Sequence, residues 1–75
     1  MEPQHYINEY IQYSVQDHPR VVRYEAGYID AQGNKYTEES RIRTLAEALL
    51  RVRLKENGIS PSELPPAEVE LRFLS

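Results

Sequence analysis

Apolar and polar residues alternate along two segments in the first half of the chain. From His5 to Val15 the odd positions are mostly apolar, and from Arg20 to Asp30 the even positions are. A period of two with many Ile, Val and Tyr residues is typical of strands that bury one face. The sequence therefore predicts two strands, paired antiparallel, with a bulge or the close approach of another backbone at Gly27.

The first of these segments also fits a helix. Ile7, Tyr10, Ile11 and Ser14 follow the helical period, and Pro3 suits a first helical turn. The alternation and the β-branched content favour the strand, but these residues leave both structures open.

A long helix is predicted from Thr37–Ser40 to about Asn57. The segment starts with a capping hydroxyl followed by acidic residues, and Gly58 supplies a left-handed residue at its end. At about 100° per residue, the apolar side chains fall on one arc with Leu54 at its margin. The arc consists of Ile42, Leu45, Ala46, Leu49, Leu50 and Val52. A short extra strand at Lys35-Tyr36 is an option.

The segment from Glu68 to Phe73 alternates strictly and predicts a final strand. We therefore expect one small α+β domain over residues 1–75. Its order is β-β-α-β, a two-layer sandwich with a three-stranded, mainly antiparallel sheet and one long helix packed on one face. The final strand is expected beside the first and parallel to the second. The expected core combines the helix arc with Ile7, Ile11, Tyr13, Val15, Val22, Tyr24, Tyr28, Val69, Leu71 and Phe73, and Glu9 on that face needs a partner.

Composition narrows the classes of function. The chain has no cysteine and a formal net charge of −3. The acidic balance argues against a protein that binds mainly by neutralising phosphates. No run of apolar residues reaches the length of a membrane span, so we expect a cytoplasmic protein that does not bind membranes.

No residue pattern indicates an enzyme. His5 and His18 are the only histidines, and they lack the spacing that places two imidazoles on one helix face. Glycines form no phosphate-binding motif, and no nucleophile stands in a recognisable motif with a base. We expect no catalysis, no metal, no cofactor and no small-molecule ligand.

Six tyrosines in 75 residues are the most unusual compositional feature. Tyrosine suits half-buried surfaces that contact partners. The alternation places Tyr6 and Tyr10 on the sheet face away from the helix, beside Arg23 and Arg72. We predict that these four residues bind another protein, a second copy of the chain, or both, as in a small regulator or inhibitor. A sheet edge offers a second route, and weak binding of single-stranded nucleic acid on the same face is the alternative.

Arg53 is the fifth candidate binding residue. It lies near the apolar arc of the predicted helix, where a purely structural design would place Leu or Ile. Two interpretations follow: the side chain pairs with a carboxylate such as Glu56 or Glu9, or it belongs to an interface.

Overall fold

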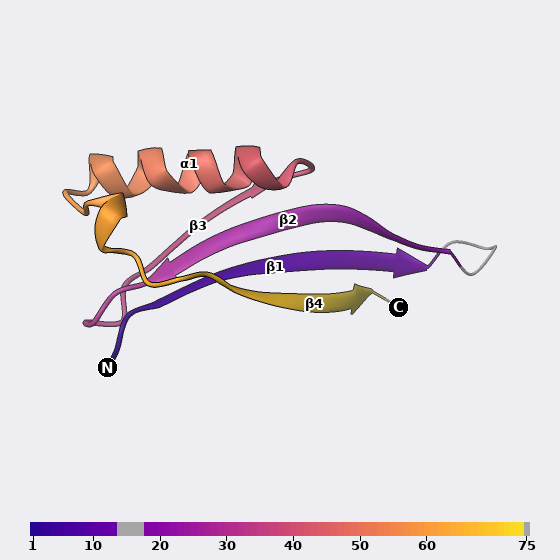
Figure 1. Cartoon of the computed structure of the whole chain (residues 1–75), viewed down its shortest axis with the longest axis horizontal. Coiled ribbons are helices and arrows are strands. Elements are labelled where there is room, and N and C mark those ends of the chain that lie inside the picture. The colour runs from indigo at the N-terminus through magenta and orange to yellow at the C-terminus, as the bar shows by residue number, and fades with distance from the viewer. Residues whose placement is uncertain (14–17, 75) are drawn as a thin grey trace.

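The computed structural model describes residues 1–13 and 18–74. Its elements in chain order are β1 (Gln4–Tyr13), β2 (Pro19–Ile29), β3 (Lys35–Ser40), α1 (Arg43–Glu56), a short 3-10 helix η1 (Pro61–Glu63) and β4 (Glu68–Leu74). The strands form one sheet in the order β3-β2-β1-β4, and α1 lies on one side of it (Figure 1). The fold is α+β, as predicted, and the first segment is a strand rather than a helix.

The sheet has four strands and is mixed, which corrects the predicted three-stranded, mainly antiparallel sheet. β1 and β2 pair antiparallel, as predicted, and so do β2 and β3. The additional strand is β3, which contains the residues Thr37 to Ser40 that were predicted to start the helix. Its backbone groups pair with β2, and this tertiary pairing overrides the capping signal of the local sequence. The helix starts after it, where the Ser40 hydroxyl accepts a hydrogen bond from the Ile42 amide at 3.1 Å.

β3 also reverses the direction predicted for the last strand. β4 pairs beside β1, as predicted, but it runs parallel to β1 and therefore antiparallel to β2. One more antiparallel strand before the crossover reverses the direction in which the chain returns. β1 and β2 are consequently both central, while β3 and β4 form the two edges.

The core lies between α1 and the β2–β3 half of the sheet. Its cluster of buried side chains consists of Ala26, Tyr28, Ala46, Leu50 and Leu54. The buried helix positions are spaced by four residues, so the buried stripe is rotated from the predicted arc toward Leu54. Arg53 is then on the flank facing β3 and Arg43 on the flank facing β1, where they pair with Glu38 and Glu9 respectively.

Several residues predicted for the core are exposed. These are Ile42 just before the helix, Leu45, Leu49 and Val52 on the helix, and Tyr13, Val69, Leu71 and Phe73 on the sheet. Ile7 and Ile11 are buried as predicted, Val22 and Tyr24 are half-buried, and Val15 lies outside the described residues. A helix with its side chains is about 10–12 Å wide, whereas four strands at about 4.8 Å spacing are wider. One helix therefore covers β2 and β3, and the helix side of β4 stays open, whereas Ile7 and Ile11 of β1 are buried.

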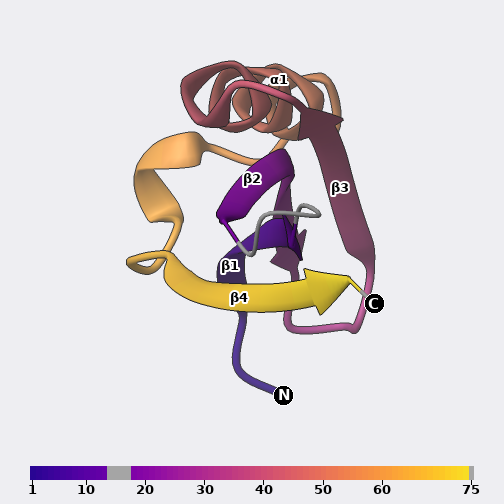
Figure 2. The same ribbon diagram turned by 90° about the vertical axis from the view of Figure 1, so that its right-hand side faces the viewer.

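The open part of the helix side carries an apolar strip, which we define as Tyr13, Val21, Val69, Leu71 and Phe73. Tyr13 and Phe73 stack with their ring centroids 5.8 Å apart. Figure 1 shows why the strip is uncovered: the β1–β2 hairpin and the end of β4 extend past α1. Figure 2 shows β4 at the edge of the sheet that lies farthest from α1.

The helix ends as the sequence indicates. The Ile59 amide donates to the Leu54 carbonyl at 2.9 Å, the Gly58 amide donates to the Lys55 carbonyl at 3.1 Å, and Gly58 has a φ of +77°. These two bonds form a Schellman motif, which requires a left-handed residue at Gly58. Ile59 then packs against the core cluster. In the described part of the chain, no helix has the length and apolar character needed to cross a membrane.

Candidate binding site on the open sheet face

The sheet face away from α1 brings four of the five predicted binding residues together. Tyr6 and Tyr10 alternate along β1, Arg23 pairs with Tyr10 from β2, and Arg72 pairs with Tyr10 from β4. Residues opposite each other on neighbouring strands share a face. The four side chains therefore lie on one surface, which we call the open face.

The ring of Tyr6 lies directly over Gly27 on the neighbouring strand. A Cβ atom added at Gly27 would come within 2.1 Å of the Tyr6 Cζ atom. The predicted close approach at Gly27 is therefore made by a side chain, not by another backbone. The irregularity in β2 lies elsewhere, where Tyr10 pairs with Arg23 and Ile11 pairs with Val21. This shift places Val21 opposite Ile11 on the helix side, although the plain alternation had assigned it to the open face.

Tyr10 contacts a basic side chain from β2. The Arg23 Cζ atom lies 4.2 Å from the centroid of the Tyr10 ring, which is cation–π geometry. On the other side of Tyr10, the Arg72 Nη2 atom donates to Glu70 Oε2 at 2.5 Å. Arg23 thus covers one aromatic ring, while Arg72 is held within its own strand.

Two polar atoms of the open face are buried without a partner. Asn8 is 7% exposed, and its Nδ2 atom donates to Glu25 Oε1 at 2.9 Å. The Asn8 Oδ1 atom and the Tyr6 hydroxyl have no hydrogen-bond partner among the described residues. A buried polar atom without a partner costs free energy, on the order of 1–3 kcal/mol, and is rare in native proteins. Both atoms are covered by their neighbours, so a group from outside the chain reaches them only when those side chains move. The Lys35 side chain lies close enough to the Tyr6 hydroxyl to lower its pKa as a hydrogen-bonding neighbour, so an outside donor would compete with Lys35 there.

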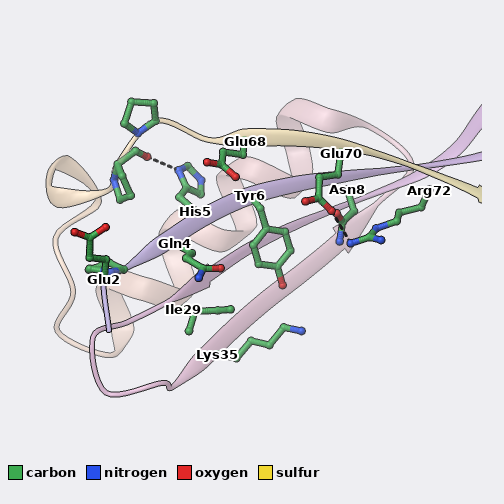
Figure 3. Close-up of a pocket in the computed structure, with 13 residues that line it drawn as sticks. Glu2, Gln4, His5, Tyr6, Asn8, Ile29, Lys35, Glu68, Glu70 and Arg72 are labelled. Atoms are coloured by element: carbon green, nitrogen blue, oxygen red, sulfur yellow. Dashed lines mark hydrogen bonds and ion pairs between the residues drawn. The ribbon is translucent and has the colours of Figure 1, made fainter.

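Asn8 and Tyr6 line a hollow of about 690 Å³ on this face. Its charged lining residues are Glu2, Lys35, Glu68, Glu70 and Arg72. In Figure 3 the Tyr6 ring stands between the side chains of β4 and Lys35, with Asn8 farther along β1 beside Glu70 and Arg72. The hollow is thus lined by three carboxylates and two basic groups, and one of the basic groups, Arg72, is already paired with Glu70.

The environment of Tyr6 favours its neutral form. Burial raises the pKa of its hydroxyl above the ordinary value, the Glu25 carboxylate raises it further, and Lys35 acts in the opposite direction. The Lys35 Nζ atom lies 5.9 Å from the centroid of the Tyr6 ring. At neutral pH the hydroxyl keeps its proton and can donate a hydrogen bond as well as accept one.

Arg53 is not part of this site. Its Nη1 atom donates to Glu38 Oε2 at 2.7 Å, on the helix side of the sheet. The predicted pairing with a carboxylate is confirmed, although the partner is Glu38 on β3 rather than Glu56 or Glu9. Glu9, whose place on the helix side required a partner, pairs with Arg43 at 3.7 Å.

Sequence reasoning placed the carboxylates of Glu25 and Glu70 beside the open face, but it did not name Asn8 or Lys35 as site residues. The signal for Asn8 was present, because it lies between Tyr6 and Tyr10 in the same alternation. The place of Lys35 depends on how β3 pairs with β2, and a single strand does not encode its register with its neighbours.

The described residues contain no cluster of three or more His, Cys, Asp or Glu side chains that could hold a metal ion. His5 is half-buried, and its Nδ1 atom lies 2.9 Å from the Pro65 carbonyl oxygen, which fixes the segment before β4 against β1. Comparisons with protein-family models, with curated proteins and with solved structures find no match to this chain.

Proposed function

We propose that the chain is a non-enzymatic protein-binding module, a small regulator or inhibitor that recognises a partner through its open face. The observation that carries this proposal is that Asn8 and Tyr6, which both line the hollow, each have a buried polar atom without a hydrogen bond, Asn8 Oδ1 and the Tyr6 hydroxyl. A bound partner that reaches these atoms would remove their desolvation cost. We place this activity in the cytoplasm, since a cysteine-free chain suits a reducing compartment.

The chemistry of the hollow favours a partner segment that presents a basic side chain. Asn8 Oδ1 can only accept hydrogen bonds. On β4, Glu70 lies opposite Asn8 and Glu68 lies opposite Tyr6, and both residues line the hollow. The Tyr6 ring offers an aromatic surface next to these acceptors. A Lys or Arg side chain would satisfy the amide oxygen, pair with a carboxylate and pack its alkyl part on the ring.

The same features do not support the alternative, binding of single-stranded nucleic acid. Arg23 already lies over the Tyr10 ring, where a base would have to stack. The carboxylates that line the hollow would repel phosphate. We therefore keep nucleic acid as an outcome of the test rather than as a second proposal.

The proposal is tested by panning a random-peptide display library on the folded protein and titrating the selected peptides into isotope-labelled protein. We expect peptides with Lys or Arg to be enriched and to shift the amide signals of Tyr6, Asn8 and Tyr10. Tyr6→Phe is the sharpest variant, because it removes only the hydroxyl. We expect it to weaken peptide binding several-fold and to leave the free energy of unfolding equal to that of wild type or up to about 3 kcal/mol higher, since the hydroxyl it removes is buried without a partner.

Val52→Ala is the matched control, because Val52 is an exposed residue of α1 on the other side of the sheet. It should leave peptide binding unchanged. Selected peptides that bind Tyr6→Phe and a Tyr6→Ala/Tyr10→Ala variant as well as wild type would refute the proposal. Binding of oligo-dT at low salt that displaces every selected peptide would also refute the proposal. That outcome would support binding of single-stranded nucleic acid instead.

A further inference from the structure

The outer edge of β4 is unpaired within the part of the chain that the structure describes. β4 is the last strand of the sheet, and its seven residues pair on one side only, with β1. Its helix-side residues Val69, Leu71 and Phe73 are all exposed. An exposed edge with apolar side chains is a template for another strand, and natural proteins rarely leave such an edge without a partner.

The sequence of β4 is complementary to itself. Antiparallel pairing of two copies about a two-fold axis at Leu71, the midpoint of Glu68–Leu74, would place Glu70 of each copy opposite Arg72 of the other. Val69 would then oppose Phe73, and Leu71 would oppose itself. Glu70 and Arg72 would each meet the opposite charge on the open face, Glu68 would lie opposite Leu74, and the apolar pairs would lie on the helix side.

The neighbouring registers lack this property. A two-fold axis perpendicular to the sheet keeps each residue on its own face, and residues opposite each other must share a face. In every allowed register one residue therefore lies opposite its own copy, and the axis runs between those two copies. An axis at Glu70 would oppose two Glu70 carboxylates, and an axis at Arg72 would oppose two Arg72 guanidinium groups. Like charges directly opposite each other destabilise a strand pair.

We propose that β4 pairs with β4 of a second copy, antiparallel and centred on Leu71, to give one continuous eight-stranded sheet. The apolar strips of the two protomers then join between the two helices and lose part of their exposure to water. This pairing uses the backbone edge of β4 and does not require the partner proposed for the open face, although Glu70 and Arg72 also line the hollow there. The interface is small, and the dimer therefore depends on protein concentration.

The test is sedimentation velocity over a range of concentrations with charge variants of β4. Wild type should show a dimer fraction that rises with concentration. Glu70→Arg and Arg72→Glu each create two like-charge oppositions, and we expect each to lower the dimer affinity at least tenfold. These side chains are about half exposed, so both variants should fold, which circular dichroism checks.

The decisive result comes from mixing the two variants. Glu70→Arg carries two basic groups and Arg72→Glu carries two acidic groups at the paired positions, so an equimolar mixture should form a heterodimer. The double variant Glu70→Arg/Arg72→Glu should recover the wild-type dimer. Two controls change the charge equally without creating a like-charge pair: Glu68→Arg, which would lie opposite Leu74, and Arg51→Glu on the helix.

If none of these charge changes alters the dimer affinity, the proposed pairing is wrong. Such a result would indicate contact between the apolar strips on the helix side, because Glu70 and Arg72 lie on the open face. A wild-type protein that stays monomeric up to its solubility limit would also overturn the proposed pairing. Peptide binding to the open face is measured separately with Tyr6→Phe, so failure of one proposal is distinguishable from failure of the other. Slower amide exchange within residues 68–74 at high concentration would support the pairing.

Discussion

The two halves of the helix-facing side of the sheet both contain strands in which apolar and polar residues alternate, but their environments differ. Under α1, β2 and β3 contribute Ala26 and Tyr28 to a sealed core with Leu50 and Leu54. Beside it, β4 presents apolar residues in a strict alternation that remain half exposed. Alternation therefore identifies the apolar face of a strand, but it does not indicate whether another element covers that face.

The difference has a geometric origin. A single helix fills the width of about two strands, and α1 contacts β2 and β3. The chain is 45 Å long in its longest dimension, because the β1–β2 hairpin extends beyond the helix. The hairpin and β4 therefore share a surface that this chain leaves open among its described residues.

The largest expected effect comes from truncating a leucine in each half. Leu50 is 1% exposed and Leu71 is 53% exposed. Leu50→Ala should lower the free energy of unfolding by about 2–5 kcal/mol, because it leaves a cavity in the core. Leu71→Ala should change it by less than about 0.5 kcal/mol at concentrations where the chain is monomeric. Urea unfolding monitored by circular dichroism gives both values.

Leu50→Met is the control for the first substitution, since it nearly conserves volume and should cost less than about 1.5 kcal/mol. Equal losses for Leu50→Ala and Leu71→Ala in the monomer would mean that the two halves are equally covered, which would contradict the comparison.

The next effect tests the open face, where Tyr6 rather than a helix covers the sheet. Gly27→Ala places a Cβ where the Tyr6 ring lies, so the ring must move, and we expect a loss of about 1–3 kcal/mol. In a Tyr6→Ala/Gly27→Ala double variant the ring is absent and this cost disappears. A double-mutant cycle by urea unfolding measures the coupling, and strictly additive losses would show that the two residues do not interact.

A smaller effect is expected at the boundary between the halves, where Arg43 of α1 reaches Glu9 of β1. The atoms are 3.7 Å apart, and the Arg43 side chain is nearly half exposed. Arg43→Ala should therefore cost less than about 1 kcal/mol, and the difference from wild type should shrink as salt is added. Thermal melts at low and high salt test this. A large, salt-independent loss would mean that Arg43 seals the core by packing.

The smallest effect concerns the turn between β2 and β3. The Asp30 carboxylate accepts hydrogen bonds from the Asn34 side chain and from the Asn34 and Gln32 amides, and these bonds lower the pKa of Asp30 below its ordinary value of 3.8. Because folding lowers the pKa of Asp30, its charged carboxylate stabilises the folded state at pH values above the pKa of Asp30 in the unfolded chain. This stabilisation is lost as the pH falls through the pKa of Asp30 in the folded chain.

Asp30→Asn should therefore lower the melting temperature slightly at neutral pH, and the two proteins should converge in acid. The matched measurement is a melting curve of both proteins at each pH. A difference that persists unchanged into acid would show that the charge of Asp30 is not responsible.

The helix start illustrates why part of the fold escaped prediction. Thr37-Glu38-Glu39-Ser40 has the composition of a helix start, and yet it forms the edge strand β3. Local preference at these residues is worth only a few tenths of a kcal/mol per residue, which pairing with β2 and burial against α1 exceed. The missed strand also reversed the predicted direction of β4, so one local error changed the sheet from mainly antiparallel to mixed.

The sequence by itself determined the features that depend on a single segment. These are the second long strand, the end of the helix at Gly58 and the alternation of β4, because each follows from a periodicity or a backbone conformation. The alternation favoured the first strand, and with it the placement of Tyr6 and Tyr10 on one face, but a helix also fitted those residues. Only the tertiary structure decided register and coverage: that Asn8 keeps a buried, unpartnered oxygen, that Tyr6 lies on Gly27, and that Leu71 remains exposed. Those properties depend on which strands lie side by side and how far one helix extends across them.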